Sequence, residues 1–222
     1  MIGFTLASKQ DFVGAAAEYE KGLALSPGDA RVYRSSAIFL ALAGRFDEAV
    51  TRARHAVELD PLDALSHANL AATYWWARRY AEALESYNRA LELDSSSNVM
   101  IGRGHAYYWL GNYEAARTAC DKPTPSWQKY TCLAMVYDKL GRRADAQAQL
   151  ALLQKSYGET AQYQYAEIFA QWGDVPRALE ALERAVALHD GGLEFTKVDP
   201  MVDPLRNEPR FKAVLAGLKF RD

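Results

Sequence analysis

Cysteine is scarce in this chain of 222 residues: Cys120 and Cys132 are the only two. Neither lies in a C-x-x-C motif or in a Cys/His cluster, so the sequence gives no support for a zinc site or a framework of disulfides. We therefore expect two reduced thiols that are buried as small apolar side chains. Reduced thiols are typical of a cytoplasmic protein.

An excess of charge of one sign and long apolar runs are also missing. The formal net charge is −2 at pH 7, which creates no field that would attract nucleic acid or an anionic membrane. No apolar run approaches the ~20 residues of a membrane span, and the start, MIGFTLASKQDF, lacks the charged beginning and apolar core of a signal peptide. We expect a soluble, cytoplasmic chain without nucleic-acid or membrane partners.

An internal repeat organises what is present. The segment GRFDEAVTRARHAVELDP, which starts at Gly44, aligns with RRYAEALESYNRALELDS, which starts at Arg78, 34 positions later. Alanine recurs at one point of each unit with spacings of 30 to 34 residues: Ala15, Ala49, Ala83, Ala116, Ala146 and Ala178. A period of this length is typical of solenoids that are built from stacked repeats.

Each unit contains two amphipathic segments with apolar residues at i, i+3, i+4 and i+7, which indicates two helices. Pro27 and Pro61 end second helices, because proline cannot continue the hydrogen bonding of a helix. In most units a glycine divides the two segments, where it suits the left-handed residue that ends a helix: Gly44, Gly111, Gly141 and Gly173. The sequence therefore predicts an all-α fold of antiparallel helix hairpins.

The unit ARVYRSSAIFLALAGRFDEAVTRARHAVELDP, residues 30–61, resembles the tetratricopeptide repeat. It has the residues of that family in the family's order: Tyr33, Ala37, Gly44, Phe46, Ala49, Ala56 and Pro61. The resemblance is strong over residues 10–118 and weaker beyond them. It implies a right-handed α-solenoid in which the first helices of the hairpins line the concave side, where such arrays usually hold a partner.

The repeats also predict how the chain is divided. We expect a tetratricopeptide array over residues 1–190 and a C-terminal extension with a capping helix over residues 191–222. The array is predicted to contain one partial repeat and five fuller ones: 1–29, then 30–63, 64–96, 97–126, 127–158 and 159–190.

Three positions depart from the repeat pattern. Arg78 stands where other units have glycine, so that turn accepts another residue type or costs ~1 kcal/mol of backbone strain. Pro123 and Pro125 should stop the second helix of the fourth unit early, and we expect the stack to bend near residues 121–127.

Both ends of the sequence indicate a longer context. By register Met1 falls inside a first helix, so we expect that the chain was cut from a longer protein. Asp199-Pro200 and Asp203-Pro204 have the pattern of a helix start, with aspartate as the cap and proline at the first helical position. The stretch KVDPMVDPLRNEPRF resembles the tail of tetratricopeptide arrays in bacterial signalling proteins with a class III nucleotidyl cyclase, winged-helix or Ser/Thr kinase domain.

Residues for catalysis, metal binding or cofactor binding do not come together in the sequence. GRGH, residues 102–105, lacks the third glycine and the preceding strand of a dinucleotide fingerprint, so we interpret it as small residues at a helix contact. The four histidines lie in four different units without a local ligand partner. We expect no enzyme activity, no metal and no cofactor, with His105 and Tyr108 as the one catalytic alternative.

The first helices carry the candidate binding residues. Tyr74, Trp75 and Trp76 are consecutive and point about 100° apart, so one buried helix face cannot hold all three. The residues that the resemblance places in a peptide-binding groove are Arg34, Ile38, Leu65, Asn69, Ala72, Trp75, Trp76, Ile101, His105, Tyr108, Trp109, Met135 and Tyr163. The clamp by which family members hold acidic chaperone tails needs basic residues that the fourth unit lacks. An aromatic groove instead favours an apolar or aromatic anchor on the partner.

Two alternatives stay open at this point. The large aromatic side chains can pack between neighbouring repeats instead of lining a groove. For function, we predict a non-catalytic module that binds a peptide or helix of a partner protein. The alternative is a regulatory or sensor arm of a larger bacterial signalling protein, which contacts its own neighbouring domain or associates with itself.

Overall fold

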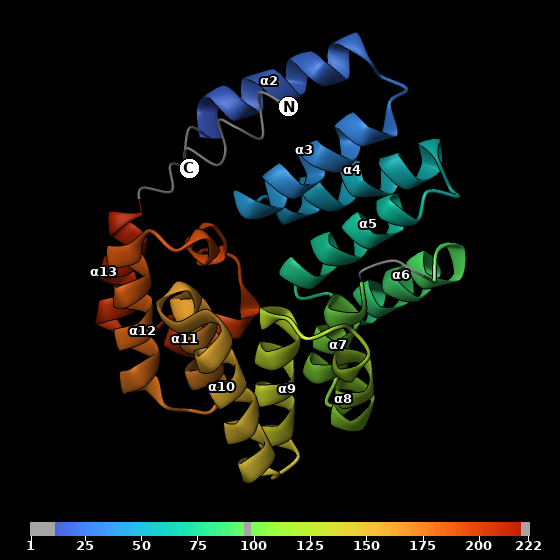
Figure 1. Ribbon diagram of the computed structural model, residues 1–222. Helices are drawn as coiled ribbons and strands as arrows, with labels where there is room; N and C mark the ends of the chain where they lie inside the picture. The colour runs from blue at the N-terminus through green and yellow to red at the C-terminus, as the bar shows by residue number, and fades with distance from the viewer. Residues whose placement is uncertain (1–11, 96–98, 219–222) are drawn as a thin grey trace. The chain divides into compact units, whose positions relative to one another are not determined.

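The computed structural model describes residues 12–95 and 99–218 (Figure 1). These residues form α-helices and short 3-10 helices, and no strand occurs among them. None of the helices in these ranges is both long and apolar enough to cross a bilayer. The predicted all-α fold of helix hairpins is confirmed.

The chain forms two compact units, Met1–Gly102 and Arg103–Leu218, and we describe each by itself. The helices of the first unit are α2 (Phe12–Leu25), α3 (Ala30–Leu42), α4 (Phe46–Leu59), α5 (Ala64–Trp76) and α6 (Tyr80–Leu93). Helix α7 (Met100–Trp109) begins in the first unit and continues into the second. The second unit then contains α8 (Tyr113–Asp121), α9 (Trp127–Lys139), α10 (Arg143–Tyr157), η1 (Gly158–Ala161), α11 (Gln162–Gln171), α12 (Val175–Leu188), η2 (Gly191–Phe195), η3 (Pro200–Leu205) and α13 (Pro209–Gly217).

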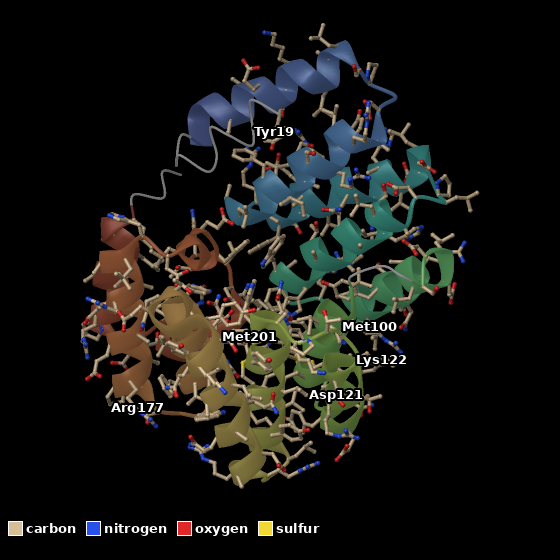
Figure 2. All side chains as sticks on the ribbon, in the orientation of Figure 1. Tyr19, Met100, Asp121, Lys122, Arg177 and Met201 are labelled. Atoms are coloured by element: carbon tan, nitrogen blue, oxygen red, sulfur yellow. A yellow bond between two sulfur atoms is a disulfide. The ribbon has the colours of Figure 1, made fainter. Side chains whose placement is uncertain are left out.

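The first unit stacks two hairpins, α3 with α4 and α5 with α6, and α2 packs on α3 (Figure 1). Asp29 and Asp63 start the first helices, because each side chain accepts a hydrogen bond from the backbone N–H two residues on, at 2.9 and 3.1 Å. Tyr19 of α2, labelled in Figure 2, has its ring centroid 5.2 Å from that of Phe39 of α3. Local capping and aromatic packing thus fix the helix starts and their stacking.

The alanine ladder is completely buried in both units. All six alanines have 0% of their surface exposed: Ala15, Ala49, Ala83, Ala116, Ala146 and Ala178. A methyl group lets two helix backbones approach closely, whereas a longer side chain would have to fit into an already close-packed interior. The repeat spacing in the sequence is therefore the spacing of these buried positions.

The turns between the two helices of a hairpin share one backbone conformation. Glycines occupy four of them with φ between 71° and 85°: Gly44, Gly111, Gly141 and Gly173. Arg78 has φ 61° at the equivalent turn, so a non-glycine residue adopts the left-handed conformation there. The N–H of Arg79 donates to the carbonyl of Tyr74 at 2.8 Å, as the N–H of Arg45 donates to the carbonyl of Leu40 at 2.9 Å. The same end of helix forms with and without glycine.

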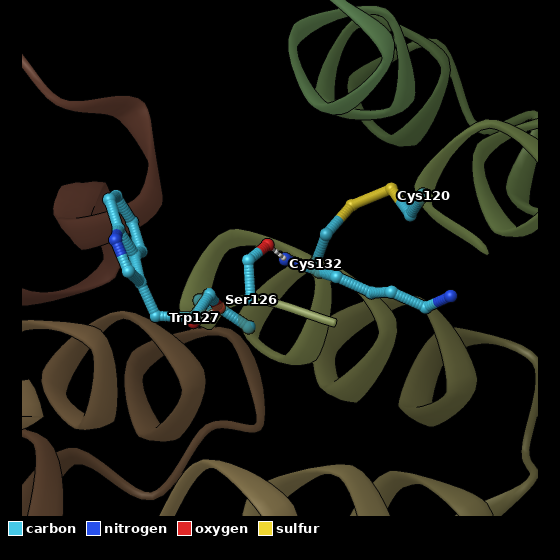
Figure 3. The surroundings of a disulfide bond; sticks show 6 residues. Cys120, Ser126, Trp127 and Cys132 are labelled. Atoms are coloured by element: carbon cyan, nitrogen blue, oxygen red, sulfur yellow. Dashed lines mark hydrogen bonds between the residues drawn. A yellow bond between two sulfur atoms is a disulfide. The ribbon is translucent and has the colours of Figure 1, made fainter. Parts of the chain in front are cut away.

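In the second unit, α8 ends at Asp121, two residues before Pro123, so the predicted early stop is confirmed. Lys129 holds the connection to α9, because its Nζ donates to the carbonyls of Asp121 and Pro123 at 2.5 and 3.2 Å. The hydroxyl of Ser126 accepts a hydrogen bond from the Lys129 N–H at 3.3 Å and caps α9 (Figure 3).

The two cysteines form a disulfide, so the expectation of reduced thiols is wrong (Figure 3). Cys120 lies in the last turn of α8 and Cys132 lies in α9, and their Cα atoms are 6.0 Å apart across the short connection. The positions are 12 apart in sequence. No C-x-x-C spacing is needed, because the packing of α8 on α9 brings the two side chains together.

The interpretation of GRGH as small residues at helix contacts is confirmed. A Cβ atom built on Gly102 would lie 2.5 Å from the ring of Tyr87, within the first unit. A Cβ atom built on Gly104 would lie 2.2 Å from the Sγ of Cys120, within the second unit. Both glycines are required by close approach of a neighbouring side chain, and neither supports a nucleotide site.

The C-terminal extension folds back on the last hairpin of the second unit. The 3-10 helix η3 packs on α11, and α13 packs on α12 as the predicted capping helix. Met201 of η3, labelled in Figure 2, and Phe211 of α13 are fully buried. Asp199 starts η3 as predicted, because its side chain accepts a hydrogen bond from the Met201 N–H at 2.8 Å.

The second predicted helix start in the extension is wrong. Asp203 and Pro204 lie inside η3, and the next helix begins at Pro209. Asp203 instead forms an ion pair with Arg206 at 2.5 Å. An aspartate followed by proline suits either the start or the interior of a short 3-10 helix, so the dipeptide alone did not decide between them.

Candidate functional site

The candidate residues of the first unit include Arg34, which is paired rather than free. Its guanidinium contacts the carboxylate of Asp63, the residue that caps α5. Burial alone would raise the pKa of Asp63, but hydrogen bonds from Ser66 and Leu65 and the charge of Arg34 together lower it. Arg34 therefore fixes the start of α5, and its charge is already balanced.

Along α5 the candidate residues lie on one side of the helix, at positions 65, 69, 72, 75 and 76. We call Leu65, Asn69, Ala72, Trp75 and Trp76 the α5 stripe. Leu65 is 52% exposed, and the other four are partly buried. The side-chain amide of Asn69 donates to the carbonyl of Leu65 at 2.9 Å. Ile38 of α3 and Ile101 of α7 are also partly buried.

The two tryptophans have different surroundings. Trp76 packs against a buried cluster that includes Phe39 and Leu40 of the preceding hairpin, so it serves at least in part as a contact between repeats. Trp75 stands 6.4 Å from Trp76 between ring centroids, with the planes inclined by 59°. Tyr74 is buried, and its hydroxyl accepts a hydrogen bond from Arg54 at 2.7 Å. Each of the three rings thus faces a different neighbour.

On α7 the second unit contains His105, Tyr108 and Trp109. Burial lowers the pKa of His105 to about 4, so its imidazole is neutral at pH 7. Burial also raises the pKa of Tyr108, whose hydroxyl donates to the side chain of Gln171 at 2.8 Å. Trp109 is partly buried and stands edge-on to Tyr108, with 5.7 Å between centroids. This setting does not provide the poised acid or base that the catalytic alternative requires.

Three candidate residues of the second unit are almost completely buried: Tyr108, Met135 and Tyr163. Buried side chains cannot contact a partner without opening of the fold, so the surface proposed below does not include them. The hydroxyl of Tyr163 donates to the carboxylate of Asp199 at 3.0 Å. The residue that the repeat register places on the inner face of α11 therefore holds the chain's own extension.

Further hydrogen bonds hold the extension on α11. The side chain of Gln171 donates to the carbonyl of Met201 at 2.7 Å. Glu167 is hydrogen bonded to Asp199, and burial followed by the charge of Asp199 raises the pKa of Glu167 well above its ordinary value. Asp199 already accepts hydrogen bonds from Tyr163 and Met201, so of this pair Glu167 is the group that holds a proton more readily.

The repeat pattern of the sequence does not predict this cluster of α11 and the extension. A signal for it was present, because Tyr163, Glu167 and Gln171 are spaced four apart and form a polar row on one helix face. Such a row on a helix that is otherwise buried needs hydrogen-bonding partners. The extension with Asp199 was the segment available to provide them.

Metal ligands do not come together in the part of the chain that the structure describes. No group of three or more His, Cys, Asp or Glu side chains in residues 12–95 and 99–218 is placed to hold an ion.

Comparison with known proteins identifies the repeats. Tetratricopeptide repeat families match residues 64–97 and residues 133–192. No curated protein sequence matches the chain.

Solved structures with the same fold include PilW, PilF and YrrB. PilW, a widely conserved type IV pilus biogenesis factor, is 16% identical, with 92% of this chain and 94% of PilW covered and a TM-score of 0.65. PilF of Pseudomonas aeruginosa is 17% identical, with 88% and 92% covered and a TM-score of 0.63. YrrB, described as a TPR protein with an unusual peptide-binding site, is 20% identical, with 81% and 97% covered and a TM-score of 0.52. At these identities the likeness shows the fold alone.

Proposed function

We propose that this chain, which carries tetratricopeptide repeats over residues 64–97 and 133–192, is a non-catalytic module that binds a peptide or helix of a partner protein. Helical-hairpin solenoids use their extended inner surfaces for binding, and tetratricopeptide repeats are typically interaction modules. The description of YrrB as a peptide-binding protein supports a peptide as the ligand class.

The surface proposed for binding is the α5 stripe with Arg34 and Ile38 of α3 and Ile101 of α7. The observation that carries this choice is the exposure of Leu65, 52%, on a helix face that continues through Ala72 to the two tryptophans. Within the described part of the first unit, the elements packed on α5 are α3, α4 and α6. His105 and Trp109 lie on the part of α7 that belongs to the second unit, so they stay separate candidates there and are not counted in this surface.

The chemistry of the α5 stripe favours an amphipathic ligand. Leu65, Ala72 and Trp75 offer apolar contact, and Asn69 uses its amide N–H within its own helix, so its carbonyl oxygen can accept a hydrogen bond from a partner backbone. Aromatic and aliphatic anchors of a partner are the groups that such a surface binds most strongly. The charge of Arg34 is paired with Asp63, so Arg34 holds the start of α5 in place and does not offer a free charge to the ligand.

The test uses a peptide selected from a random displayed library against the purified protein, with its dissociation constant measured by calorimetry. We expect Leu65→Ala to weaken binding about tenfold, since a well-placed interface side chain contributes over ~1 kcal/mol. Leu62→Ala is the matched control, because Leu62 is 73% exposed and lies before α5, outside the stripe. Unchanged affinity in Leu65→Ala, or an equal loss in Leu62→Ala, would remove the stripe from the binding site.

A second candidate is the regulatory arm of a bacterial signalling protein, which the resemblance of KVDPMVDPLRNEPRF to such tails supports. In this role the chain grips a neighbouring domain or a second copy of itself. Light scattering over a range of protein concentrations tests self-association: a dimer that Leu65→Ala weakens supports it, and a monomer at all concentrations argues against it.

The cytoplasmic location stays a prediction, and the disulfide argues against it, because stable disulfides are typical of oxidising compartments. Thiol labelling of the protein taken directly from cells would decide: labelled cysteines favour the cytoplasm, and protected ones favour an oxidising compartment.

A further inference from the structure

A cavity of about 360 Å³ opens in the second unit, where the start of α9, the end of α10 and the start of α11 meet the segment η2. Its volume falls within the range of about 300–1,000 Å³ that is typical of ligand pockets. We call it the acidic pocket. Its lining residues are Trp127, Tyr157, Thr160, Ala161, Tyr163, Gln164, Glu167, Asp190, Gly191, Gly192, Glu194 and Phe195.

Aromatic rings and carboxyl groups dominate the walls of the acidic pocket. Trp127 begins α9, and Figure 3 shows its ring projecting away from the disulfide. Three acidic residues line the pocket, Glu167, Asp190 and Glu194, and none of the described residues that line it is Lys, Arg or His. Carboxylates beside aromatic faces attract a cation both by charge and by the negative face of the rings.

The acidic residues are held in different ways. Asp190 is fixed, because its carboxylate accepts hydrogen bonds from the backbone N–H groups of Tyr163 at 3.1 Å and Gly192 at 2.9 Å. Partial burial raises the pKa of Glu194, although the residue as a whole is exposed. A bound cation would favour the charged form of Glu194.

A second observation points to a ligand independently of the charges. Gln164 lines the pocket and is only 9% exposed, and no described residue forms a hydrogen bond with its side-chain amide. A buried amide normally has a hydrogen-bonding partner, and this one, which lines the pocket without a partner from the described residues, is available to a ligand there. A ligand with N–H donors would satisfy its carbonyl oxygen.

We propose that the acidic pocket binds an arginine side chain of a partner protein, with its guanidinium between the carboxylates of Asp190 and Glu194 and against the ring of Trp127. This inference rests on the proposed interaction role only in that a protein supplies the arginine. The pocket is built from the second unit alone and is separate from the α5 stripe.

Arginine fits these walls better than lysine for a geometric reason. The guanidinium is planar and presents five N–H donors, so it can stack on an aromatic ring while it donates to carboxylate and amide oxygens around its edge. The ammonium of lysine is a compact, strongly hydrated charge with three donors, and it gains less from a flat wall. The affinities of the pocket for arginine and for lysine can therefore be compared by experiment.

The test is an NMR titration of the full chain with N-acetyl-arginine amide, following the indole N–H of Trp127 and the backbone N–H of Gly192. N-acetyl-citrulline amide, which has nearly the same shape without the charge, is the control ligand, and N-acetyl-lysine amide is the comparison. We expect saturable shifts with the arginine compound, weaker binding of the lysine compound and no saturation with the citrulline compound. Binding should also weaken as salt is raised.

Protein variants locate the binding. Glu194→Gln and Trp127→Ala should each weaken binding of the arginine compound about threefold to thirtyfold. Glu180→Gln is the matched control, since Glu180 is exposed on α12 of the same unit and does not line the pocket. Equal binding of arginine and citrulline compounds, tighter binding of lysine, or an equal loss in Glu180→Gln would each overturn the proposal. None of these results depends on the outcome of the Leu65→Ala test.

Discussion

The first helices α5 and α11 occupy the same place in their hairpins and differ in what covers them. Five of the 13 residues of α5 are buried, against nine of the 10 residues of α11. The difference comes from η3, a segment outside the repeats, which packs on α11. Within the described part of the first unit, α5 packs on repeat helices, namely α3, α4 and α6. The repeat thus places the same face of the first helix at the surface of each hairpin. The segment after the last repeat covers this face on α11.

The two faces also handle polar groups differently. On α5, Asn69 turns its amide N–H back to its own helix. On α11, Tyr163 and Gln171 donate to residues of the extension, and Glu167 is hydrogen bonded to Asp199. A covered face needs such a network, because buried polar groups without partners are costly.

The largest loss of stability should follow from removing a side chain of η3 that is buried against α11. Met201→Ala removes a fully buried side chain of η3, and we expect it to lower the free energy of unfolding by about 3 kcal/mol. Leu65→Ala on the open face should change it by less than about 0.5 kcal/mol. Urea denaturation followed by circular dichroism measures both. A similar loss in the two variants would contradict the distinction between an open and a covered face.

A second contrast concerns the two glycines of α7. Gly104→Ala would press a methyl group on the Sγ of Cys120, which the disulfide holds in place, and we expect a loss of about 2 kcal/mol. Gly102→Ala meets the outer end of the Tyr87 ring in the first unit, which can shift, so the loss should be smaller.

A double-mutant cycle separates the disulfide from other causes. If Sγ is the obstacle, Gly104→Ala should cost much less in a Cys120→Ala background than in the wild type. Equal costs in both backgrounds would show that the helix backbone, rather than the disulfide, demands glycine at this position.

These contrasts show how much the sequence could predict. Gly44 and the alanine ladder report local geometry, a turn and a close contact, so the hairpins could be predicted from them. The disulfide and the cover of η3 on α11 depend on contacts between elements that no repeat pattern encodes. For the same reason Tyr163 could be assigned to a helix face by register but not recognised as covered by the extension.

The acidic pair on the covered face makes stability depend on pH. The pKa of Glu167 is raised well above 4.5, so between pH 4.5 and its raised value the folded protein holds a proton that the unfolded chain has lost. Stability should therefore fall as pH rises through this range. Glu167→Gln keeps a donor to Asp199 without a titrating proton, and we expect it to gain about 1–2 kcal/mol at pH 8.

At pH 4 this advantage should nearly vanish, because Glu167 is then protonated in both states. Thermal unfolding of the wild type and Glu167→Gln over pH 4 to 8 checks the slope. Glu180→Gln, on exposed α12, serves as the control and should leave the slope unchanged. A constant difference between Glu167→Gln and wild type at every pH would mean that packing, not the proton, causes the gain.

The smallest effect concerns one turn in each unit. Arg78 has φ 61° in the first unit, and Gly141 has φ 71° at the equivalent turn of the second. A left-handed conformation costs a residue with a side chain about 1–2 kcal/mol, but glycine also loses more freedom on folding, by about 0.4–1 kcal/mol. Arg78→Gly should therefore stabilise the protein by only about 0.5 kcal/mol, and Gly141→Arg should destabilise it by a similar amount.

The two substitutions test whether backbone conformation alone governs these turns. Around Gly141 no atom lies within 4 Å of an added Cβ, so only the backbone term should count there. The Arg78 guanidinium, in contrast, donates to the carbonyl of Trp76 at 2.5 Å, beside the α5 stripe. Arg78→Gly could destabilise the protein in urea denaturation while Gly141→Arg behaves as expected. In that case the Arg78 side chain contributes more stability than is gained by removing the backbone strain. Its hydrogen bond would then be part of what holds the end of α5, and with it Trp76, in place.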